Sequence, residues 1–223
     1  MNLAKSFEFF NPDSCTGRIH IIGCGSVGST VAELLARFGL TKFSLYDFDV
    51  VEEHNLVNQM FTKSQVGQPK VQAVYDNLMA INPEVKEWTK LYPDGYTGQK
   101  LSGYVFLCVD NIDLRRKIVE ENKLNMNIKG MFDFRTALTS GQHYAADWSN
   151  PKDVENLLGT MDFSHEEAEK NVPMSACHVS LCVAPTVRLV SMVGVTNFIN
   201  FVKDGKLEKN ILTDPFEFNI ITF

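Results

Sequence analysis

Near its start, this sequence places a glycine-rich turn directly between a strand-type run and a helix-type run. RIHII (18–22) is short and largely apolar, and GCGSVGS (23–29) separates it from a segment whose apolar residues share one helical face. The alternation continues, because strand-type runs at 42–48, 85–91, 104–109 and 128–134 are interspersed with helical patterns at 64–81 and 111–125. Strands separated by helices form βαβ units. We therefore predict an α/β fold with a Rossmann-like, mostly parallel sheet and helices on both faces.

The second half of the chain is less regular. Residues 139–148 predict a strand that turns back antiparallel, and residues 208–223 predict a closing antiparallel hairpin. Between them, the polar stretch 149–175 predicts a long crossover loop, and such a connection is usually functional or mobile. A long apolar helix is expected at about 178–202. The length of 223 residues fits one domain with a proper core.

The composition argues against several classes of protein. The net charge is -6, from 21 Lys+Arg against 27 Asp+Glu, and no basic stripe points to nucleic acid. Pro185 and Arg188 interrupt the longest apolar stretch, so we expect a buried helix and not a membrane span. The first residues carry an acid and a proline where a signal peptide needs an apolar core. The 5 cysteines contain no C-x-x-C pair, which favours a reduced, cytoplasmic protein without a four-cysteine zinc site.

Three glycines in the turn form the pattern G-x-G-x-x-G. Gly23, Gly25 and Gly28 stand between the first strand and the first helix, where such glycines permit a tight turn. They also let backbone N–H groups approach a phosphate at the helix N-terminus. A turn that serves only close helix–strand packing remains an alternative.

A cluster of polar side chains follows the second predicted strand. Asp47 comes roughly 20 residues beyond the glycines, where a Rossmann-type site places an acid on a ribose hydroxyl. This placement suits any adenine nucleotide, and a nicotinamide-dependent oxidoreductase is therefore one hypothesis. It leaves Asp49, Asn55 and Gln59 in the same connection unexplained.

Four segments in order, at 21–40, 45–61, 66–85 and 106–116, resemble the ThiF/MoeB/HesA family of adenylating enzymes related to ubiquitin-activating enzymes. The resemblance runs through roughly residues 18–116. It is far more specific than the glycines alone, because the motifs follow one another in the order D-x-D-x-V-E-x-x-N-L, Q, V-G-x-x-K and D-N. It implies adenylation of the C-terminal carboxylate of a small ubiquitin-like or sulfur-carrier protein with a Gly-Gly-type tail, using ATP and Mg²⁺. It further implies a homodimer or a pair with a related subunit. Residues 1–223 would form one adenylation domain, with a nucleotide-binding half at 1–135 and the remaining elements at 136–223.

The resemblance also implies individual roles. The three glycines would pack against the ATP phosphates or ribose, Asp47 would hold the ribose, and Asp49, Asn55 and Gln59 would lie near the phosphates. Lys70 would neutralise phosphate charge, and Asp110, with Asn111 beside it, would hold Mg²⁺ together with Asp49. The alternatives are a helix N-cap for Asp110 and a solvated surface lysine for Lys70.

The sequence departs from the family pattern at Asn58. Relatives read N-L-x-R-Q, whereas Asn58 replaces the arginine that would stabilise charge on the phosphates. Either Arg115, Arg116 or Arg135 supplies that charge, or the protein is a non-catalytic nucleotide-binding partner subunit. Arg135 has an ordinary alternative role as a partner of Asp133.

Two other departures from the family pattern concern its N-terminal segment and its zinc-binding cysteines. The sequence begins close to its first strand, so the N-terminal segment from which relatives offer an arginine to a partner subunit is expected to be missing. The two C-x-x-C pairs of many bacterial relatives are missing too, and no zinc is expected.

One thiol is a candidate for catalysis. Cys177 ends the polar connection, where relatives often keep a cysteine, and a helix opening at residue 178 would lower the pKa of the thiol. A thiolate there could accept the carrier's acyl group as a thioester. The alternative is a packed structural cysteine. Cys24 and Cys108 are expected in the core, and Cys182 on the buried face of the long helix.

Overall fold

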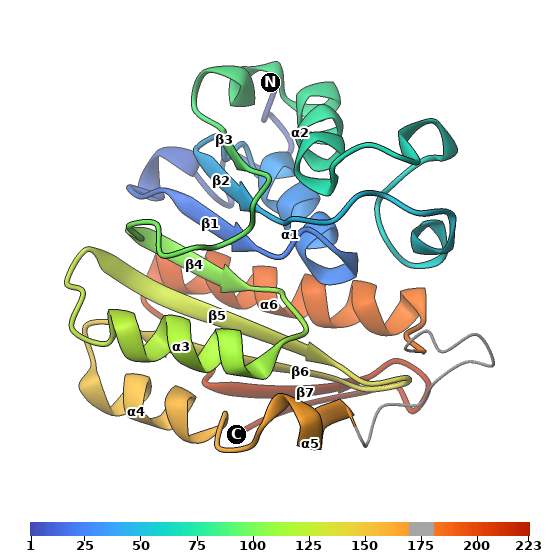
Figure 1. The fold of residues 1–223 in the computed structure, drawn as a ribbon. Coiled ribbons are helices and arrows are strands. Elements are labelled where there is room, and N and C mark those ends of the chain that lie inside the picture. Colours follow the sequence, from blue (N-terminus) through green and yellow to red (C-terminus); the bar gives the residue numbers. More distant parts are fainter. Residues whose placement is uncertain (170–180) are drawn as a thin grey trace.

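The computed structural model of the protein describes residues 1–169 and 181–223, and one eight-stranded sheet runs through both halves of the chain. Its order is β3-β2-β1-β4-β5-β6-β7-β8. The strands are β1 (Ile19–Ile22), β2 (Phe43–Tyr46), β3 (Lys90–Tyr92), β4 (Gly103–Leu107), β5 (Ile128–Thr136), β6 (Gly141–Asp147), β7 (Asn210–Asp214) and β8 (Asn219–Thr222). The first five are mutually parallel, and β6, β7 and β8 pair antiparallel (Figure 1). The predicted fold class is confirmed.

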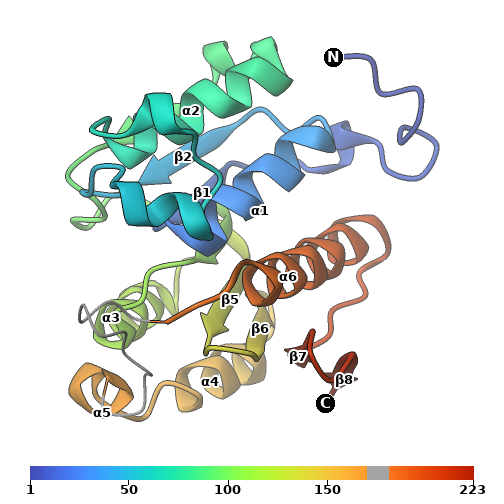
Figure 2. The same ribbon diagram turned by 90° about the vertical axis from the view of Figure 1, so that its right-hand side faces the viewer.

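Helices cover both faces of this sheet. They are α1 (Ser26–Arg37), α2 (Lys70–Ile81), α3 (Ile112–Asn122), α4 (Pro151–Gly159), α5 (His165–Glu169) and α6 (Ala184–Asp204). Helix α1 packs against α2 and α6, while α3 packs against α4 and α5 across the sheet (Figures 1 and 2). Two buried clusters result, one on each face. Among the described residues, no helix is long and apolar enough to cross a membrane.

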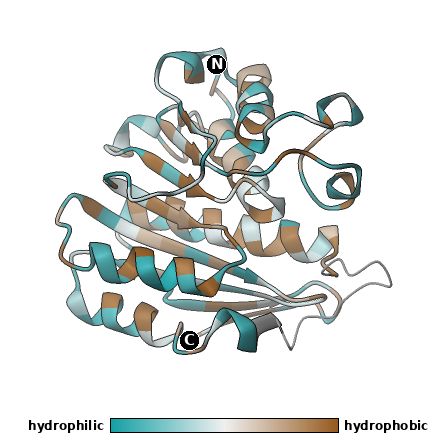
Figure 3. Ribbon diagram, viewed as in Figure 1, coloured by the Kyte–Doolittle hydropathy of each residue, from teal (hydrophilic) through white to brown (hydrophobic). Residues whose placement is uncertain are grey.

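The central strands are apolar because both of their faces are covered. Every residue of β1 and β4 is buried, and Figure 3 shows runs of hydrophobic residues in both strands. Such continuous apolar strands are typical of parallel sheets between two helical layers. Phe106 of β4 meets Phe198 of α6 edge to face, with ring centroids 5.2 Å apart. The core therefore fixes α6 against the strands that end at the candidate site.

The strand order places a crevice at one edge of the sheet. β1 pairs with β2 on one side and with β4 on the other, so the direction of winding changes at β1. In open α/β sheets, ligands bind outside the carboxyl ends of the strands at such a switch point. Figure 1 shows the loop at 47–69 projecting from this edge.

Some element boundaries differ from the sequence-based predictions. The pattern at 64–81 becomes a short 3-10 helix (Lys63–Gln65) and then α2, which begins only at Lys70. Of the strand predicted at 85–91, only the last two residues belong to a strand, β3, because Asn82 and Pro83 start the 3-10 helix Pro83–Glu87. Two further short 3-10 helices are Pro12–Ser14 and Glu53–Val57.

The polar connection contains more structure than its composition indicated. The Asn150 side chain caps α4 by accepting from Lys152 N at 3.1 Å, and Val154 and Leu157 of α4 are buried. Helix α6 begins at Ala184 and not at residue 178, with Pro185 in its first turn. Cys182 therefore precedes the helix and is half-buried, so its predicted place on the buried helix face is wrong.

Candidate functional site

The glycine turn at the end of β1 is closely packed at two of its three glycines. Gly23 has φ +94, and a Cβ there would lie 2.7 Å from the backbone of Cys108 and Val109. A Cβ at Gly28 would lie 1.8 Å from the Gly23 carbonyl oxygen. Gly25 is different, since no neighbour among residues 1–169 and 181–223 lies within 4 Å of its Cβ position. Packing therefore accounts for Gly23 and Gly28, whereas Gly25 leaves open space beside the first turn of α1.

The carboxylate of Asp47 joins the glycine turn to the end of β2. Its Oδ2 accepts from Cys24 N at 2.6 Å and its Oδ1 accepts from Asp49 N at 2.9 Å. Burial raises the pKa of Asp47, and these two backbone donors act in the opposite direction. Each carboxylate oxygen has a further lone pair, so Asp47 can still accept a hydroxyl hydrogen bond.

Asp49 and Lys70 form an ion pair at the same edge. Lys70 Nζ lies 2.7 Å from Asp49 Oδ2, and Lys70 N donates to the Asp49 carbonyl at 2.9 Å. Lys70 is only 7% exposed, so it is not a solvated surface lysine. The two residues meet because Val51 N donates to the Gln68 carbonyl and Gly67 N donates to the Val51 carbonyl, both at 2.8 Å. The loop at 47–69 is thus closed at its base.

The three amide side chains of this loop have different surroundings. Asn55 is buried, and its Oδ1 accepts from Glu52 N at 2.9 Å, which shapes the short helix Glu53–Val57. Asn58 Nδ2 donates to the Cys182 carbonyl at 2.8 Å and so ties the loop to the segment before α6. Gln59 Oε1 is buried without a donor among the described residues.

Asp110 and Asn111 follow the end of β4 and precede helix α3. Asn111 is the N-cap of α3, and its Oδ1 accepts from Leu114 N at 2.8 Å. The alternative role of Asp110 as the cap is therefore wrong. Asp110 is exposed and forms no hydrogen bond or ion pair with the part of the chain that the structure describes. Gly23 packs against the backbone of Cys108 and Val109, the two residues before Asp110, and Asp110 therefore lies near the glycine turn.

The three arginines considered as replacements for the missing motif arginine are engaged within the fold. Arg115 is 5% exposed and donates to the Asp133 carboxylate and to the Val109 carbonyl. Arg135 Nε donates to Asp133 Oδ2 at 2.7 Å, its other nitrogens donate to Thr160, and its guanidinium stacks on the Tyr144 ring. The pairing of Arg135 with Asp133 is thus confirmed.

Arg116 is engaged as well, since it donates to the Met161 and Phe163 carbonyls. A catalytic role for Arg115 or Arg135 stays a prediction, and it would require these contacts to change.

The structure describes three of the cysteines discussed above and does not describe Cys177. Cys24 is fully buried, as predicted, whereas Cys108 follows the end of β4 and is half-buried; burial raises the pKa of both thiols. Burial also raises the pKa of Cys182. Cys177 and His178 lie outside the described residues, so the thioester hypothesis stays a prediction.

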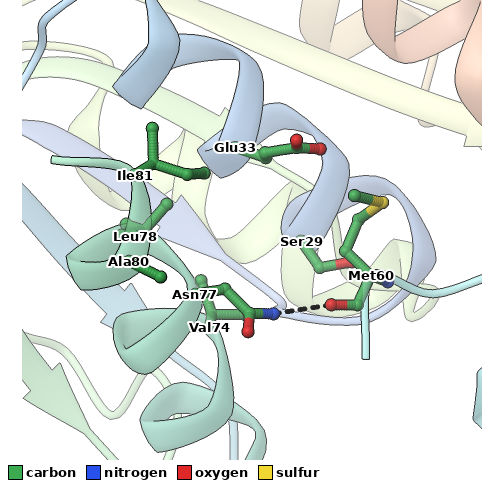
Figure 4. A pocket seen from close by; sticks show the side chains of 8 residues that line it. All are labelled: Ser29, Glu33, Met60, Val74, Asn77, Leu78, Ala80 and Ile81. Carbon is green, nitrogen blue, oxygen red and sulfur yellow. Dashed lines mark hydrogen bonds between the residues drawn. The ribbon is translucent and has the colours of Figure 1, made fainter. Parts of the chain in front are cut away.

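A pocket of about 230 Å³ lies between α1 and α2 (Figure 4). Its lining consists of Ser29, Glu33, Met60, Val74, Asn77, Leu78, Ala80 and Ile81. Asn77 Nδ2 donates to the Met60 carbonyl at 2.6 Å, and Met60 N donates to Ser29 Oγ at 3.1 Å. The lining includes none of the residues predicted for the site, so the pocket is separate from the edge described above.

The fold defines a class of Rossmann-type α/β proteins with known structures. The crystal structure of E. coli MccB with ATP is similar with a TM-score of 0.71 and 16% identity, over 95% of this chain and 65% of that chain. The structure of PaaA is similar with a TM-score of 0.71 and 15% identity, over the same shares of the two chains. At these identities, the likeness concerns the fold.

The sequence is similar to ubiquitin-like modifier-activating enzyme 5 of several insects. Identity is 33% over 144 residues for Culex quinquefasciatus, covering 57% of this chain and 35% of the relative. It is 33% over 134 residues for Drosophila persimilis, covering 53% and 34%. The aligned region thus spans about a third of the length of these relatives. Residues 14–223 match the ThiF family, and the chain belongs to that family.

One residue near this edge was not among the sequence-based candidates. Arg188 was considered only as a charge that interrupts an apolar stretch, whereas its guanidinium donates to Thr30 Oγ1 in α1. A charged side chain within an otherwise apolar helix was the available signal.

Proposed function

We propose that the chain is an adenylation domain that uses ATP and Mg²⁺ to activate the C-terminal carboxylate of a small ubiquitin-like or sulfur-carrier protein. The observation that carries the proposal is the glycine turn, which is open at Gly25 and joined to Asp47 by the hydrogen bond from Cys24 N. Family membership and the similarity to ubiquitin-like modifier-activating enzyme 5 support the same reaction class.

The edge residues suit a nucleoside triphosphate. The open space at Gly25 lies beside the N-terminus of α1, where unpaired backbone N–H groups and the helix dipole favour an anion. Asp47 would accept a ribose hydroxyl, and Lys70 would place its positive charge near the phosphates. Asn55 and Gln59 belong to the same proposed site, and the unpartnered Gln59 Oε1 offers an acceptor.

Asp110 is the best candidate ligand for Mg²⁺. It is exposed and forms no contact with other charged groups of the described residues, and Asp49 keeps one carboxylate oxygen apart from Lys70. An ion bound mainly by phosphate oxygens and water needs only one or two carboxylates. When bound, Mg²⁺ would neutralise part of the phosphate charge. Asn111 would act indirectly, because its side chain caps the helix beside Asp110.

The proposed reaction is an in-line displacement at the α-phosphorus. A carboxylate oxygen of the carrier tail forms a bond to that phosphorus, the bond to the bridging oxygen of the β-phosphate breaks, and pyrophosphate leaves with the electron pair. The domain contributes mainly alignment and charge stabilisation. Lys70 would neutralise the polyphosphate during this step without exchanging a proton.

The remaining assignments form part of the proposal. Residues 1–223 would act as one domain in the cytoplasm, as a homodimer or paired with a related subunit, with no requirement for zinc, nucleic acid or a membrane. Transfer of the acyl group to Cys177 would follow adenylation if that thiol is accessible.

The test is ATP–pyrophosphate exchange with the purified protein, Mg²⁺ and carriers that end in Gly-Gly. We expect carrier-dependent exchange that Asp110→Asn reduces and Asp76→Asn preserves. Asp76 is a suitable control because it is another exposed acid, on α2, whose carboxylate accepts from Gln72 of the same helix at 2.7 Å. Tight ATP binding without exchange would contradict the proposal.

A second candidate function is a nucleotide-binding partner subunit without catalysis. Asn58 favours it, because this uncharged side chain donates to the Cys182 carbonyl at 2.8 Å. Exchange that appears only after a related subunit is added would support this alternative.

A further inference from the structure

We propose that Arg188 binds the β- and γ-phosphates of ATP and supplies from α6 the positive charge that Asn58 does not. The inference rests on the proposed function. Arg188 lies one turn inside α6, and its Nη1 donates to Thr30 Oγ1 of α1. Thr30 Oγ1 in turn donates to the Ser26 carbonyl at 2.8 Å. A guanidinium is therefore placed against the first turns of the helix that follows the glycine turn.

The two helices joined by this contact both begin at the edge of the sheet that carries the candidate site (Figure 1). Helices α1 and α6 lie side by side, with both N-termini at the carboxyl edge of the sheet (Figure 2). Helical side chains lean toward the helix N-terminus, so an arginine in the second turn of α6 can extend toward that edge. The step from Thr30 to Ser26 is about 6 Å along the helix axis, which a long arginine side chain can span.

The guanidinium of Arg188 is half-buried and donates to a hydroxyl group. Among the described residues, Arg188 forms no ion pair. The carboxylate of Glu33 acts electrostatically on Arg188, and Glu33 Oε1 already accepts from Arg37 Nε at 2.8 Å. Burial lowers the pKa of Arg188, with Glu33 opposing the shift. A half-buried guanidinium that forms no ion pair within residues 1–169 and 181–223 is well suited to bind an anionic ligand.

The position of Asn58 connects Arg188 to the missing motif arginine. Asn58 Nδ2 bonds to the Cys182 carbonyl, just before α6 begins at Ala184. The place of the family arginine is thus bonded to the segment just before α6. Because Arg115, Arg116 and Arg135 are engaged with Asp133 and with backbone carbonyls, Arg188 is the arginine best placed to compensate.

In the proposed reaction, Arg188 would form charge-assisted hydrogen bonds to non-bridging phosphate oxygens. It would stabilise the negative charge that develops on the departing pyrophosphate. It would form no covalent bond and transfer no proton.

The test measures ATP and adenosine binding by calorimetry, beside pyrophosphate exchange, for the wild-type protein and four variants. Arg188→Gln should weaken ATP binding by about tenfold to a hundredfold and leave adenosine binding unchanged. Arg188→Lys should weaken ATP binding less, because it keeps the charge but loses the planar donors. Thr30→Val is the matched control, since it removes the contact with α1 and leaves the guanidinium present, so ATP binding should persist.

The fourth variant combines Arg188→Gln with Asn58→Arg. It should recover most of the ATP affinity, because the charge returns at the motif position. Equal ATP affinity in Arg188→Gln and wild type would overturn the inference while leaving the proposed function intact. Equal losses in Arg188→Gln and Thr30→Val would also overturn it, because they would indicate helix packing alone. A wild-type protein that binds no ATP would overturn both.

Discussion

The buried carboxylate of Asp133 holds Arg115, whose guanidinium also donates to the carbonyl of Val109, the residue before Asp110. Asp133 is fully buried and binds Arg135 as well. The contact links the middle of β5 to the end of β4 through one side chain of α3. Asp133 is thus a positioning residue for the proposed Mg²⁺ ligand.

Replacing Asp133 tests this link. Asp133→Asn leaves two half-buried or buried arginines without their carboxylate, which should lower the free energy of unfolding by about 3–5 kcal/mol. Urea denaturation monitored by circular dichroism measures the change. Asp76→Asn, on the surface of α2, is the control and should leave the urea midpoint unchanged. A midpoint for Asp133→Asn equal to that of the wild-type protein would refute the anchoring role.

The glycines of the turn should respond differently to alanine. Gly28→Ala places a Cβ against the Gly23 carbonyl and should destabilise the fold by about 1–3 kcal/mol. Gly25→Ala places its Cβ in space that is open among the described residues, so the free energy of unfolding should change by no more than about 1 kcal/mol. ATP affinity should nevertheless fall, because the new methyl group occupies the open space. Calorimetric titration of both variants checks this, and full ATP affinity in Gly25→Ala would contradict the assigned role.

Lys70 should matter more for the nucleotide than for stability. Lys70→Gln removes the cation beside Asp49, whose carboxylate is 49% exposed, so the loss of stability should be about 1 kcal/mol. The dissociation constant for ATP should rise by about tenfold. Lys63→Gln is the control, since Lys63 is 87% exposed and lies 3.9 Å from Glu53. Equal ATP affinities for the two variants would argue against Lys70 as a phosphate ligand.

The stability of the fold should decrease in mild acid because of His143. Burial lowers the pKa of His143 to about 4, and the neutral ring is bonded at Nδ1 to the Asp133 carbonyl and at Nε2 to Asn197 Nδ2. Since the folded pKa lies below the unfolded value of 6.5, this contribution is fully present above pH 6.5 and is lost as the pH falls toward 4. Its full size is about 3 kcal/mol.

Denaturation curves between pH 7 and pH 4 measure this effect. His143→Gln should reduce the slope of stability against pH, although not abolish it, because burial also lowers the pKa of His20 to about 4. An identical slope in the variant would exclude His143 as the cause.

The parts of the site that lie within one βα unit could be predicted from the sequence. Gly23 and Asp47 end neighbouring parallel strands, and their spacing alone indicates that they meet. Lys70 was found through the motif, although its pairing with Asp49 depends on the closed base of the loop. The strands of the core were found because a buried parallel strand has a continuous apolar pattern.

The contacts between distant segments could not be predicted in the same way. Arg188 and Thr30 meet only because α6 packs beside α1, and no local pattern encodes that packing. The same holds for Asn58 and the Cys182 carbonyl. Helix α4 was missed because its short amphipathic pattern, with Val154 and Leu157 inside, lies within a polar stretch.

Because the loop at 47–69 is closed at its base, the contact between Asp49 and Lys70 does not depend on the length of the loop. The backbone bonds between Val51 and the segment 67–68 hold Asp49 next to Lys70 whatever lies between them. Lengthening a loop raises the entropic cost of closing it only slightly, since each doubling of its length costs only about 0.6 kcal/mol. Exposed positions of this loop other than Asn55, Asn58 and Gln59 are therefore places where residues can be inserted or exchanged, by evolution or by design, while the Asp49–Lys70 pair at its base is retained.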